Sequence, residues 1–537
     1  MPEFKNPIIP GFNPDPSICR VGDSFFLITS SFEYFPGIPI YHSKDLVKWE
    51  HIGHVLTRPT QLNLRTVEPG AGIWASTIRY VEREKRWYVT TCKWDRYRPT
   101  LGERVWPRGF VVYTDDIWKQ DSWSDPIYFD QIGFDQDLFF DDDGKVYLST
   151  TYRLHNPPDS TQKHFAIHVS EIDINTGRSL TAPIVLRTAP SGLAEGSHII
   201  KRGRYYYLFT AEGGTETHHS EWVMRSSQGP LGPYEVGPLE AVNPLVCNST
   251  NEDVQNTGHA DLVEDCDGNW WAVLLAVRPT RIEVGEWVDS ALGRETFILP
   301  VEWVEDWPIF NEGRPIGLSG EGPKMYRLQQ PTDWVANLSL TDLELGWYHK
   351  HTPLRKYYSL SERPGHLRVY GSSYDLASPE SPSMLVRKQS AKAMTFTADL
   401  DFSPARPTYE AGVVAFWNSF CYFSIGIKKD ADGYKKLVVT EPVDGKGNFK
   451  SHAHAVSDLS VNTTRLAIKC TATSYSVGYV ASSGFHCLST VSTKIMTTAP
   501  PLGMAYTGVM LGVYAFGEME PCLSPADFSG IRLALTE

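Results

Sequence analysis

The sequence of 537 residues contains no long hydrophobic run. No stretch approaches the ~20 apolar residues that a membrane-spanning helix needs, so we expect no membrane association. The opening residues MPEFKNPIIPG also lack the apolar segment of a secretory signal. We therefore expect a cytoplasmic protein, or a secreted one whose signal has been removed from this sequence.

Basic residues are scarce relative to acidic ones, with 50 Lys and Arg against 63 Asp and Glu and a net charge of −13. Nucleic-acid binding requires basic patches, so this balance argues against it. The eight cysteines are scattered, without a C-x-x-C pair or a Cys/His zinc spacing, and nothing requires a disulfide. Low-complexity tracts and heptads are absent too, and the length predicts two or three globular domains.

Helical periodicity is also hard to find in residues 1–320, where short β-branched and aromatic runs dominate. Five runs look alike: GDSFFLITSS, EKRWYVTTCK, DGKVYLSTTY, GRYYYLFTAE and DGNWWAVLLA. Their anchors Phe25, Trp87, Tyr147, Tyr205 and Trp270 are 62, 60, 58 and 65 positions apart. A repeat of this length suits four strands, so we predict an all-β fold that begins with a five-bladed β-propeller over 1–320. Unrelated hairpins in a sandwich are the alternative, which the even spacing disfavours.

A second segment lies 10 to 12 residues before each anchor: NPDPSI, GIWASTI, FDQDLFF, AEGSHII and TGHADLV. Its polar residues are Asp15, Ser76, Asp135, Glu195 and His259. A single proline-flanked Asp is ordinary turn chemistry. If the segment is the innermost strand of each blade, however, these side chains ring the propeller axis, and three converging acids are unfavourable unless they serve a function.

Two carboxylates across a pocket are what cleavage of a glycosidic bond requires. Asp15, held between prolines, suits the group that stays ionised, and Glu195 suits the proton donor. Asp135 would be the third group, whose charge raises the pKa of the donor. This chemistry needs no organic cofactor. The competing interpretation is a Ca²⁺ ion held by the acids and His259.

Six segments in order resemble glycoside hydrolase family 43 across residues 6–310: the opening NPIIPGFNPDPSICRVGDSFFLITSSF, then GIWAS, GFDQDLFFDDDGKVYL, AEGSHIIKRGRYYYLFTAEGGT, GHADLVEDCDGNWWAVLLAVRP and LGRETFILPVEW. The resemblance implies a five-bladed propeller and inverting hydrolysis of xylose- or arabinose-containing chains. It suggests Asp15 as general base, Asp135 as pKa modulator and orienter, and Glu195 as general acid.

The same resemblance suggests binding roles for four further residues. Phe32 and Trp74 would contact sugar, Arg278 would be a polar contact near the terminal sugar, and His259 would be the axial histidine that helps to hold calcium in several members. Ordinary alternatives are core aromatics, an Arg paired with a structural acid, and a neutral core histidine. The chain departs from many β-xylosidases of the family at Ser76-Thr77 and Gln136-Asp137, which leaves open which pentose is removed.

The second half of the chain differs in pattern. Gly and Pro enrichment around 311–345 predicts a linker at 321–345, and many short strands with period-two patterning predict a β-sandwich over 346–537. Family members of this length resemble the chain in carrying a concanavalin-like sandwich, which packs on the propeller and lends a loop to the cleft. An independent carbohydrate-binding module is the alternative, and a structural role is favoured.

The leading hypothesis is an inverting exo-glycosidase that removes β-1,4-linked xylose, α-L-arabinofuranose or both from xylan or arabinoxylan oligosaccharides. A non-catalytic sugar-binding propeller is a second hypothesis of a different class. A five-bladed glycosidase of other specificity, for example on fructans, is a third. The sequence indicates no oligomeric state.

Overall fold

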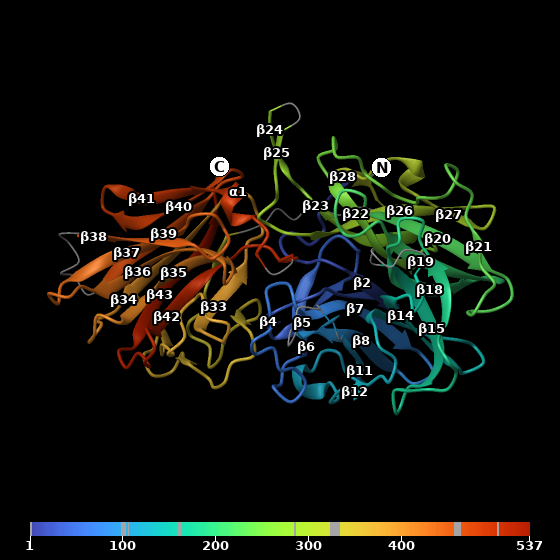
Figure 1. The fold of residues 1–537 in the computed structure, drawn as a ribbon, viewed down its shortest axis with the longest axis horizontal. Coiled ribbons are helices and arrows are strands. Elements are labelled where there is room, and N and C mark those ends of the chain that lie inside the picture. Colours follow the sequence, from blue (N-terminus) through green and yellow to red (C-terminus); the bar gives the residue numbers. More distant parts are fainter. Residues whose placement is uncertain are drawn as a thin grey trace.

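The computed structural model describes residues 3–97, 104–105, 107–157, 164–283, 286–322, 333–455, 463–501 and 504–536. Figure 1 shows two bodies side by side, the first running from blue to green and the second from yellow to red. Nearly all of the regular structure is β-strand, which confirms the all-β prediction.

Five antiparallel sheets form the first body, and they follow one another along the chain. Blade 1 consists of β2 (Ser17–Val21), β3 (Ser24–Ile28), β5 (Gly37–Ser43) and β6 (Glu50–Leu56). Blade 2 consists of β7 (Gly72–Val81), β8 (Arg86–Trp94), β11 (Arg108–Thr114) and β12 (Ile127–Tyr128). Blade 3 consists of β13 (Phe134–Phe140), β14 (Val146–Arg153), β15 (Phe165–Asp173), β16 (Arg178–Ser179) and β17 (Ile184–Thr188).

Blades 4 and 5 complete the ring. Blade 4 consists of β18 (Ala194–Arg202), β19 (Tyr205–Glu212), β20 (Ser220–Ser226) and β21 (Glu235–Val236). Blade 5 consists of β22 (Gln255–Glu264), β23 (Trp270–Val277), β26 (Glu295–Val304) and β27 (Trp307–Phe310). Each inner strand contacts the next, and β22 contacts β2, so the ring is closed. The five predicted anchors all lie at or near the start of a second strand, which confirms the five-bladed propeller.

The N-terminal segment fastens the ring. The backbone N–H of Ile8 donates to Thr296 O at 2.9 Å, and β1 (Glu3–Lys5) pairs with β28 (Ser319–Glu321). Two small hairpins leave the blades: β9 (Arg96–Tyr97) with β10 (Arg104–Val105), and β24 (Thr280–Glu283) with β25 (Glu286–Val288), which stands out from the body in Figure 1. Short 3₁₀ turns span Gln120–Ser122 and Asn311–Gly313.

Two antiparallel sheets form the second body. The first contains β29 (Trp334–Val335), β31 (Tyr358–Ser359), β32 (Leu367–Val369), β34 (Met394–Asp401), β39 (Thr463–Cys470), β40 (Ser474–Ala481), β41 (Gly484–Ser492) and β43 (Ala526–Leu535). The second contains β30 (Tyr348–Lys350), β33 (Ser383–Lys388), β35 (Tyr409–Asn418), β36 (Cys421–Lys429), β37 (Lys435–Pro442), β38 (Phe449–His454) and β42 (Met510–Gly517). The helix α1 (Thr493–Met496) follows β41.

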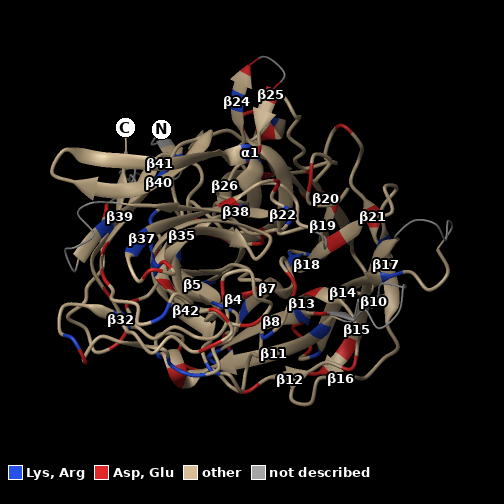
Figure 2. Cartoon of the chain, turned by 60° about the vertical axis from the view of Figure 1, so that its left-hand side comes forward, with Lys and Arg blue, Asp and Glu red and all other residues tan. Residues whose placement is uncertain are grey.

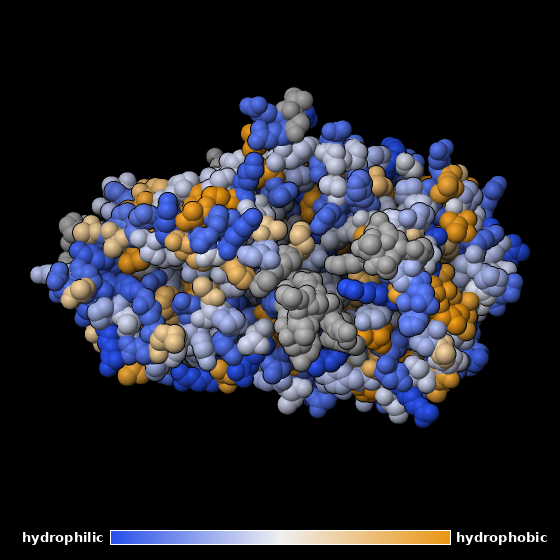
Figure 3. All heavy atoms as spheres, viewed as in Figure 1, coloured by the Kyte–Doolittle hydropathy of each residue, from blue (hydrophilic) through white to orange (hydrophobic). Residues whose placement is uncertain are grey.

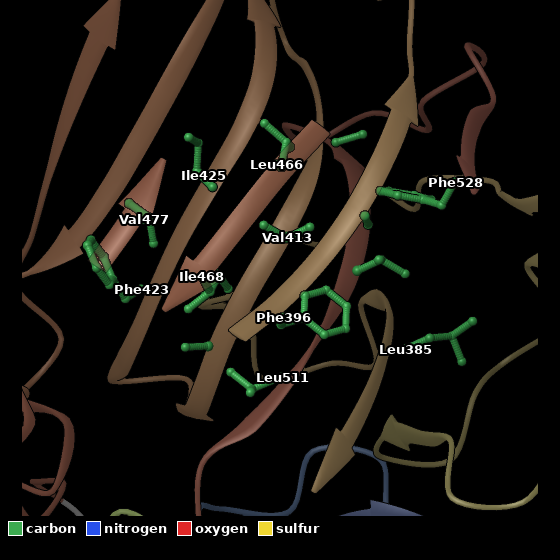
Figure 4. Close-up of a cluster of buried hydrophobic side chains, with 14 of the residues drawn as sticks. Leu385, Phe396, Val413, Phe423, Ile425, Leu466, Ile468, Val477, Leu511 and Phe528 are labelled. Carbon is green, nitrogen blue, oxygen red and sulfur yellow. The ribbon is translucent and has the colours of Figure 1, made fainter. Parts of the chain in front are cut away.

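Alternating side chains build the sandwich core. Along β34 every second residue is buried, as the period-two pattern predicts. Figure 4 shows Phe396 and Ile468 of one sheet with Val413, Phe423 and Leu511 of the other in the layer between them. Burial of apolar area contributes roughly 25 cal/mol per Å², so this layer is the main source of stability of the sandwich.

The two bodies share a sheet. The two-residue strand β4 (Tyr34–Phe35) leaves blade 1 and pairs with β30 as the edge strand of the sandwich, with His349 opposite Phe35. Within the expected linker at 321–345, β29 already pairs with β43, and residues 323–332 lie outside the described part of the chain. The sandwich is therefore joined to the propeller by backbone hydrogen bonds as well as by side chains.

The surface is mixed in charge and largely hydrophilic. Figure 2 shows acidic and basic residues interspersed over both bodies, and the face in Figure 3 carries only separate hydrophobic patches. Within the described ranges, no helix has the length and apolar character to cross a bilayer.

Candidate active site

One end of the propeller axis opens into a cavity of about 320 Å³. Six of the seven predicted site residues line it: Asp15, Phe32, Trp74, Asp135, Glu195 and His259. All five blades contribute: Asp15 and Phe32 come from blade 1, and the other four lie on the inner strands of blades 2 to 5. Ser76 does not line the cavity, because its hydroxyl turns to Thr91 Oγ1 at 3.0 Å.

A shared backbone conformation aims the axial side chains. Asp15, Asp135 and His259 have φ angles of 53°, 52° and 57°, in the left-handed region that Asp and His visit more readily than most residues. Gly196 has the same conformation in blade 4, with a φ of 54°, directly after Glu195. The strand register shifts beside Asp135, Glu195 and His259, as expected of β-bulges that re-aim a side chain. The rigid Asp15 of the NPDP motif thus shares its backbone conformation with the equivalent residues Asp135 and His259.

Asp15 is almost fully buried and is held by a cation and a hydroxyl. Arg294 donates from an Nη atom to Asp15 Oδ1 at 3.1 Å, and Ser30 donates from its hydroxyl to Oδ2 at 2.6 Å. His259 Nδ1 lies 3.8 Å from Oδ1. The guanidinium offsets the buried negative charge and fixes the direction of the carboxylate.

Asp135 has a different environment, although it is equally buried. Its Oδ2 accepts the backbone N–H of Gly196 at 3.0 Å. Burial, and then the charges of Glu195 and Asp15, raise the pKa of Asp135 well above its usual range. The shift shows that the charges of Glu195 and Asp15 both act on Asp135.

Gly196 is required where blades 4 and 5 meet. A Cβ at this position would lie 3.0 Å from three atoms of the His259 ring. Its φ of 54° is also one that other residues adopt only with strain. The glycine therefore lets the Asp135 hydrogen bond, the Glu195 side chain and the His259 ring share one small volume.

An aromatic wall lines the side of the cavity next to the sandwich. The Phe32 ring stacks on Tyr506 with centroids 5.9 Å apart, and Tyr506 meets Trp74 edge-on at 5.3 Å. The guanidinium of Arg294 lies over both Phe32 and Tyr506, at 5.6 and 5.4 Å from the ring centroids. Flat rings of this kind can stack on the faces of sugars. Tyr506 precedes β42, so the sandwich does contribute a residue to the cavity.

Arg278 is the predicted residue that the structure does not bring to the cavity. Its guanidinium makes a two-pronged pair with buried Glu295, at 2.6 and 2.8 Å, and Glu295 also accepts the N–H of Gly11. The cavity arginine is Arg294, from the LGRETFILPVEW segment. That motif was a visible signal for Arg294, whereas nothing in the sequence of the sandwich pointed to Tyr506.

The predicted calcium ion near His259 stays a prediction, because the described residues around His259 include no cluster of protein ligands for a metal. Burial lowers the pKa of His259 to about 3; Asp15 opposes this shift, and His198, His219 and Arg294 add to it. Calcium takes 6–8 oxygen ligands, but the carboxylate beside His259 is engaged by Arg294, a cation. Among the described residues, no group of three or more His, Cys, Asp or Glu could hold a metal. The imidazole instead stands as a neutral group beside Asp15.

Below the cavity, a buried network of charges links all five blades. Arg79 binds Asp261 at 2.7 Å and Asp137 at 2.8 Å, and lies 3.0 Å from His198 Nδ1. Ser17 donates to Asp261 at 2.7 Å. Although burial opposes ionisation, Arg79 lowers the pKa of Asp137, and with His198 it lowers that of Asp261 to about 2. We call Ser17, Arg79, Asp137, His198 and Asp261 the axial network.

The sequence also carries a signal for this network. Three of its members stand two positions after an axial residue: Ser17 after Asp15, Asp137 after Asp135 and Asp261 after His259. In a strand, residues two apart lie on the same face. The spacing of two therefore predicts a second ring of polar residues, one layer deeper along the propeller axis than the first.

Comparisons with known proteins agree with the geometry. The model of glycosyl hydrolases family 43 matches residues 4–308, and that of the beta xylosidase C-terminal concanavalin A-like domain matches 338–533. A non-reducing end alpha-L-arabinofuranosidase of Bacteroides ovatus is 36% identical over 552 residues, 98% of this chain and 93% of its own. A xylan 1,3-beta-xylosidase of a Vibrio species is 33% identical over 481 residues, 87% of each chain.

A solved structure is similar over the same span. The xylan beta-1,4-xylosidase from Bacillus halodurans superposes with a TM-score of 0.87 at 27% identity, over 99% of this chain and 100% of that one. The family model alone covers more than half of the sequence. The chain is therefore a glycosidase and belongs to glycosyl hydrolases family 43, with a concanavalin A-like domain after its propeller.

Proposed function

We propose that the chain is an exo-acting, inverting glycosidase that removes a terminal pentose from xylan or arabinoxylan chains. The observation that carries the proposal is the convergence of Asp15, Asp135 and Glu195 on one cavity. Three acids from three blades would repel one another at this short range. The division of labour between two carboxyl groups in glycoside hydrolysis accounts for their presence.

Asp15 is assigned the role of general base. Held by Arg294 and Ser30, its carboxylate takes a proton from a water molecule, which attacks the anomeric carbon on the face opposite to the leaving group. Glu195 is the general acid and delivers a proton to the glycosidic oxygen as the bond breaks. Inversion requires room for the water, which corresponds to a carboxyl separation of roughly 6.5–9.5 Å.

Asp135 is assigned the role of modulator. Its interaction with Glu195 couples the two titrations, so negative charge on one carboxyl group favours a proton on the other. Glu195 can then hold the proton that the leaving group needs. The hydrogen bond from Gly196 to Asp135 also fixes the orientation of the pair.

The names of the relatives support a pentose as the sugar. One is named as an arabinofuranosidase acting at non-reducing ends and another as a xylan 1,3-beta-xylosidase. A cavity of about 320 Å³ at the end of the axis suits a single terminal residue of a chain. We propose β-linked xylose and α-L-arabinofuranose as the two sugars to test.

Two variants test the assignment of roles. Asp15→Asn should abolish hydrolysis of both aryl pentosides and natural oligosaccharides, because the base is needed for either. Glu195→Gln should abolish hydrolysis of oligosaccharides but retain more activity on aryl pentosides whose leaving group needs little protonation. Wild-type rates on aryl pentosides in both folded variants would refute the assignment of roles. Binding of sugar without any turnover by the unaltered protein would instead favour a sugar-binding protein.

A product analysis tests the reaction. Arabinoxylan oligosaccharides are digested, and the anomeric form of the first pentose released is followed by NMR. Release of single pentoses with inverted configuration is the expected result, and retained configuration or internal cleavage would contradict the proposal. Turnover of sucrose, without turnover of aryl xyloside or aryl arabinofuranoside, would indicate a glycosidase for fructans instead.

A further inference from the structure

A lysine of the sandwich reaches into the segment that carries Asp15. Lys388, the last residue of β33, is half-buried at the boundary between the two bodies, and Figure 1 shows β33 close to β4 there. Its ammonium group donates to Asn13 Oδ1 at 2.7 Å. Among the residues that the structure describes, no carboxylate lies within 4.0 Å of Lys388 Nζ, so the amide oxygen of Asn13 is its main polar partner.

Asn13 joins the two segments that hold the catalytic carboxylate. Its backbone N–H donates to Arg294 O at 3.0 Å, and its carbonyl accepts the hydroxyl of Thr296 at 2.7 Å. Its side-chain oxygen also accepts the Tyr41 hydroxyl at 2.7 Å. Asp15 follows two residues later and binds the guanidinium of Arg294. The position of Asn13 therefore sets Asp15 relative to Arg294.

Lys388 touches the cavity wall by a second route. Its Nζ lies 5.1 Å from the centroid of the Phe12 ring, and Phe12 packs against Phe32 with ring centroids 5.9 Å apart. The backbone is pressed together at the same place, because a Cβ on Gly11 would lie 2.4 Å from Gln389 O. The segment 11–13 is thus fixed on one side by blade 5 and on the other by the sandwich.

We propose that Lys388 is a positioning residue for the reaction: it orders Asn13 from the sandwich side and so holds Asp15 in the direction that its role at the anomeric carbon requires. The inference rests on the proposed function of Asp15. The Nζ atom also lies 5.4 Å from the centroid of the Tyr348 ring, so an amide oxygen and two aromatic rings surround it; burial there lowers the pKa of Lys388 to about 7. The sandwich is on this view part of the catalytic apparatus, and not an independent module.

The test compares two lysines that cross the same boundary. In Lys388→Met, the side chain keeps its apolar stem but loses the charged hydrogen bond, and we expect kcat to fall about tenfold with KM within threefold. Lys392 is the matched control, since its Nζ donates to Pro279 O at 3.0 Å and it does not line the cavity. Lys392→Met should lose a similar amount of thermal stability, with kcat unchanged.

A double variant separates positioning from general destabilisation. If Lys388 acts through Asn13, adding Lys388→Met to Asn13→Ala should lower kcat no further than Asn13→Ala alone. Should Lys388→Met fail to fold, Lys388→Gln, which is too short to keep the bond, takes its place with the same expectation. A wild-type kcat in folded Lys388→Met, or effects on kcat that multiply in the double variant, would overturn the inference. Loss of activity in Asp15→Asn alongside such a result would leave the proposed function intact.

Discussion

Replacing Arg79 with methionine tests whether the axial network stabilises the propeller. Methionine keeps most of the apolar stem but leaves Asp137 and Asp261, each 1% exposed, without their cation. Removing one partner of a buried pair costs about 3–5 kcal/mol. Because one guanidinium serves both acids, the two losses overlap, and we expect about 3–5 kcal/mol in total. With ~2–4 °C per kcal/mol, the melting temperature should fall by roughly 10 °C.

The pH dependence of the loss identifies its cause. Arg79 lowers the pKa of Asp137 and Asp261, so in the wild type both carboxylates stabilise the fold above their ordinary pKa. That stability is lost as pH falls through the folded values, about 2 for Asp261. In the variant the acids are buried without a cation, so they take up protons at a higher pH and the deficit should shrink from pH 7 to pH 4.5.

Thermal and urea unfolding followed by circular dichroism measure both effects. Arg83→Met is the control, because Arg83 is 47% exposed, belongs to the same blade and pairs only at the surface with Glu84. Its loss should stay within about 0.5 kcal/mol. A loss below about 1 kcal/mol for Arg79→Met at pH 7, or one that is the same at pH 4.5, would refute the reasoning.

Three further substitutions probe the cavity. Gly196→Ala should destabilise the fold by about 1–2 kcal/mol, because it strains a left-handed backbone and forces a Cβ against the ring of His259; unchanged thermal unfolding would contradict this. Asp135→Asn should abolish activity but raise the free energy of unfolding at pH 7 by about 0.5–2 kcal/mol. The pKa of Asp135 is raised in the folded protein, so the wild type loses stability as pH rises above the ordinary pKa of an aspartate, and the variant does not. The gain should therefore vanish below about pH 4, which unfolding at several pH values measures. Tyr506→Ala should raise KM about 3- to 10-fold through the lost aromatic contact, with Tyr506→Phe as control, and an unchanged KM would exclude Tyr506 from sugar binding.

The repeat made the propeller predictable from the sequence. A turn followed by an aromatic strand recurs about every 60 positions, because every blade must turn and pack in the same way. The same equivalence predicts that Asp15, Asp135, Glu195 and His259 lie at one end of the axis, where they line one cavity. Ser76 lies outside the cavity because the register of β7 shifts between Trp74 and Thr77, and a local bulge of this kind leaves no mark in the spacing of the anchors.

Contacts between the two bodies were not predictable in this way. Tyr506 reaches the cavity and β4 joins the sheet of the sandwich only because the sandwich packs on blade 1. No periodicity within either half encodes that packing. The sequence also could not tell which of Arg278 and Arg294 reaches the cavity, since both lie next to the end of a strand. Only the position of buried Glu295 decides that Arg278 is held away from the cavity.

Burial, followed by the charges of Glu195 and Asp15, raises the pKa of Asp135, and the guanidinium groups near the axis offset little of this effect. Arg79 lies one layer below the acids of the cavity, but Asp137 and Asp261 already exceed its single charge. Arg294, the guanidinium bound to the cavity acids, donates to Asp15 and not to Asp135. Arg294 therefore lowers the pKa of Asp135 only from a distance, and Asp135 accepts a hydrogen bond from the neutral N–H of Gly196. An added cation near Asp135 would lower the pKa of Asp135 further and offset its negative charge, so we expect it to weaken the support that this charge gives to a proton on Glu195 in the proposed acid catalysis.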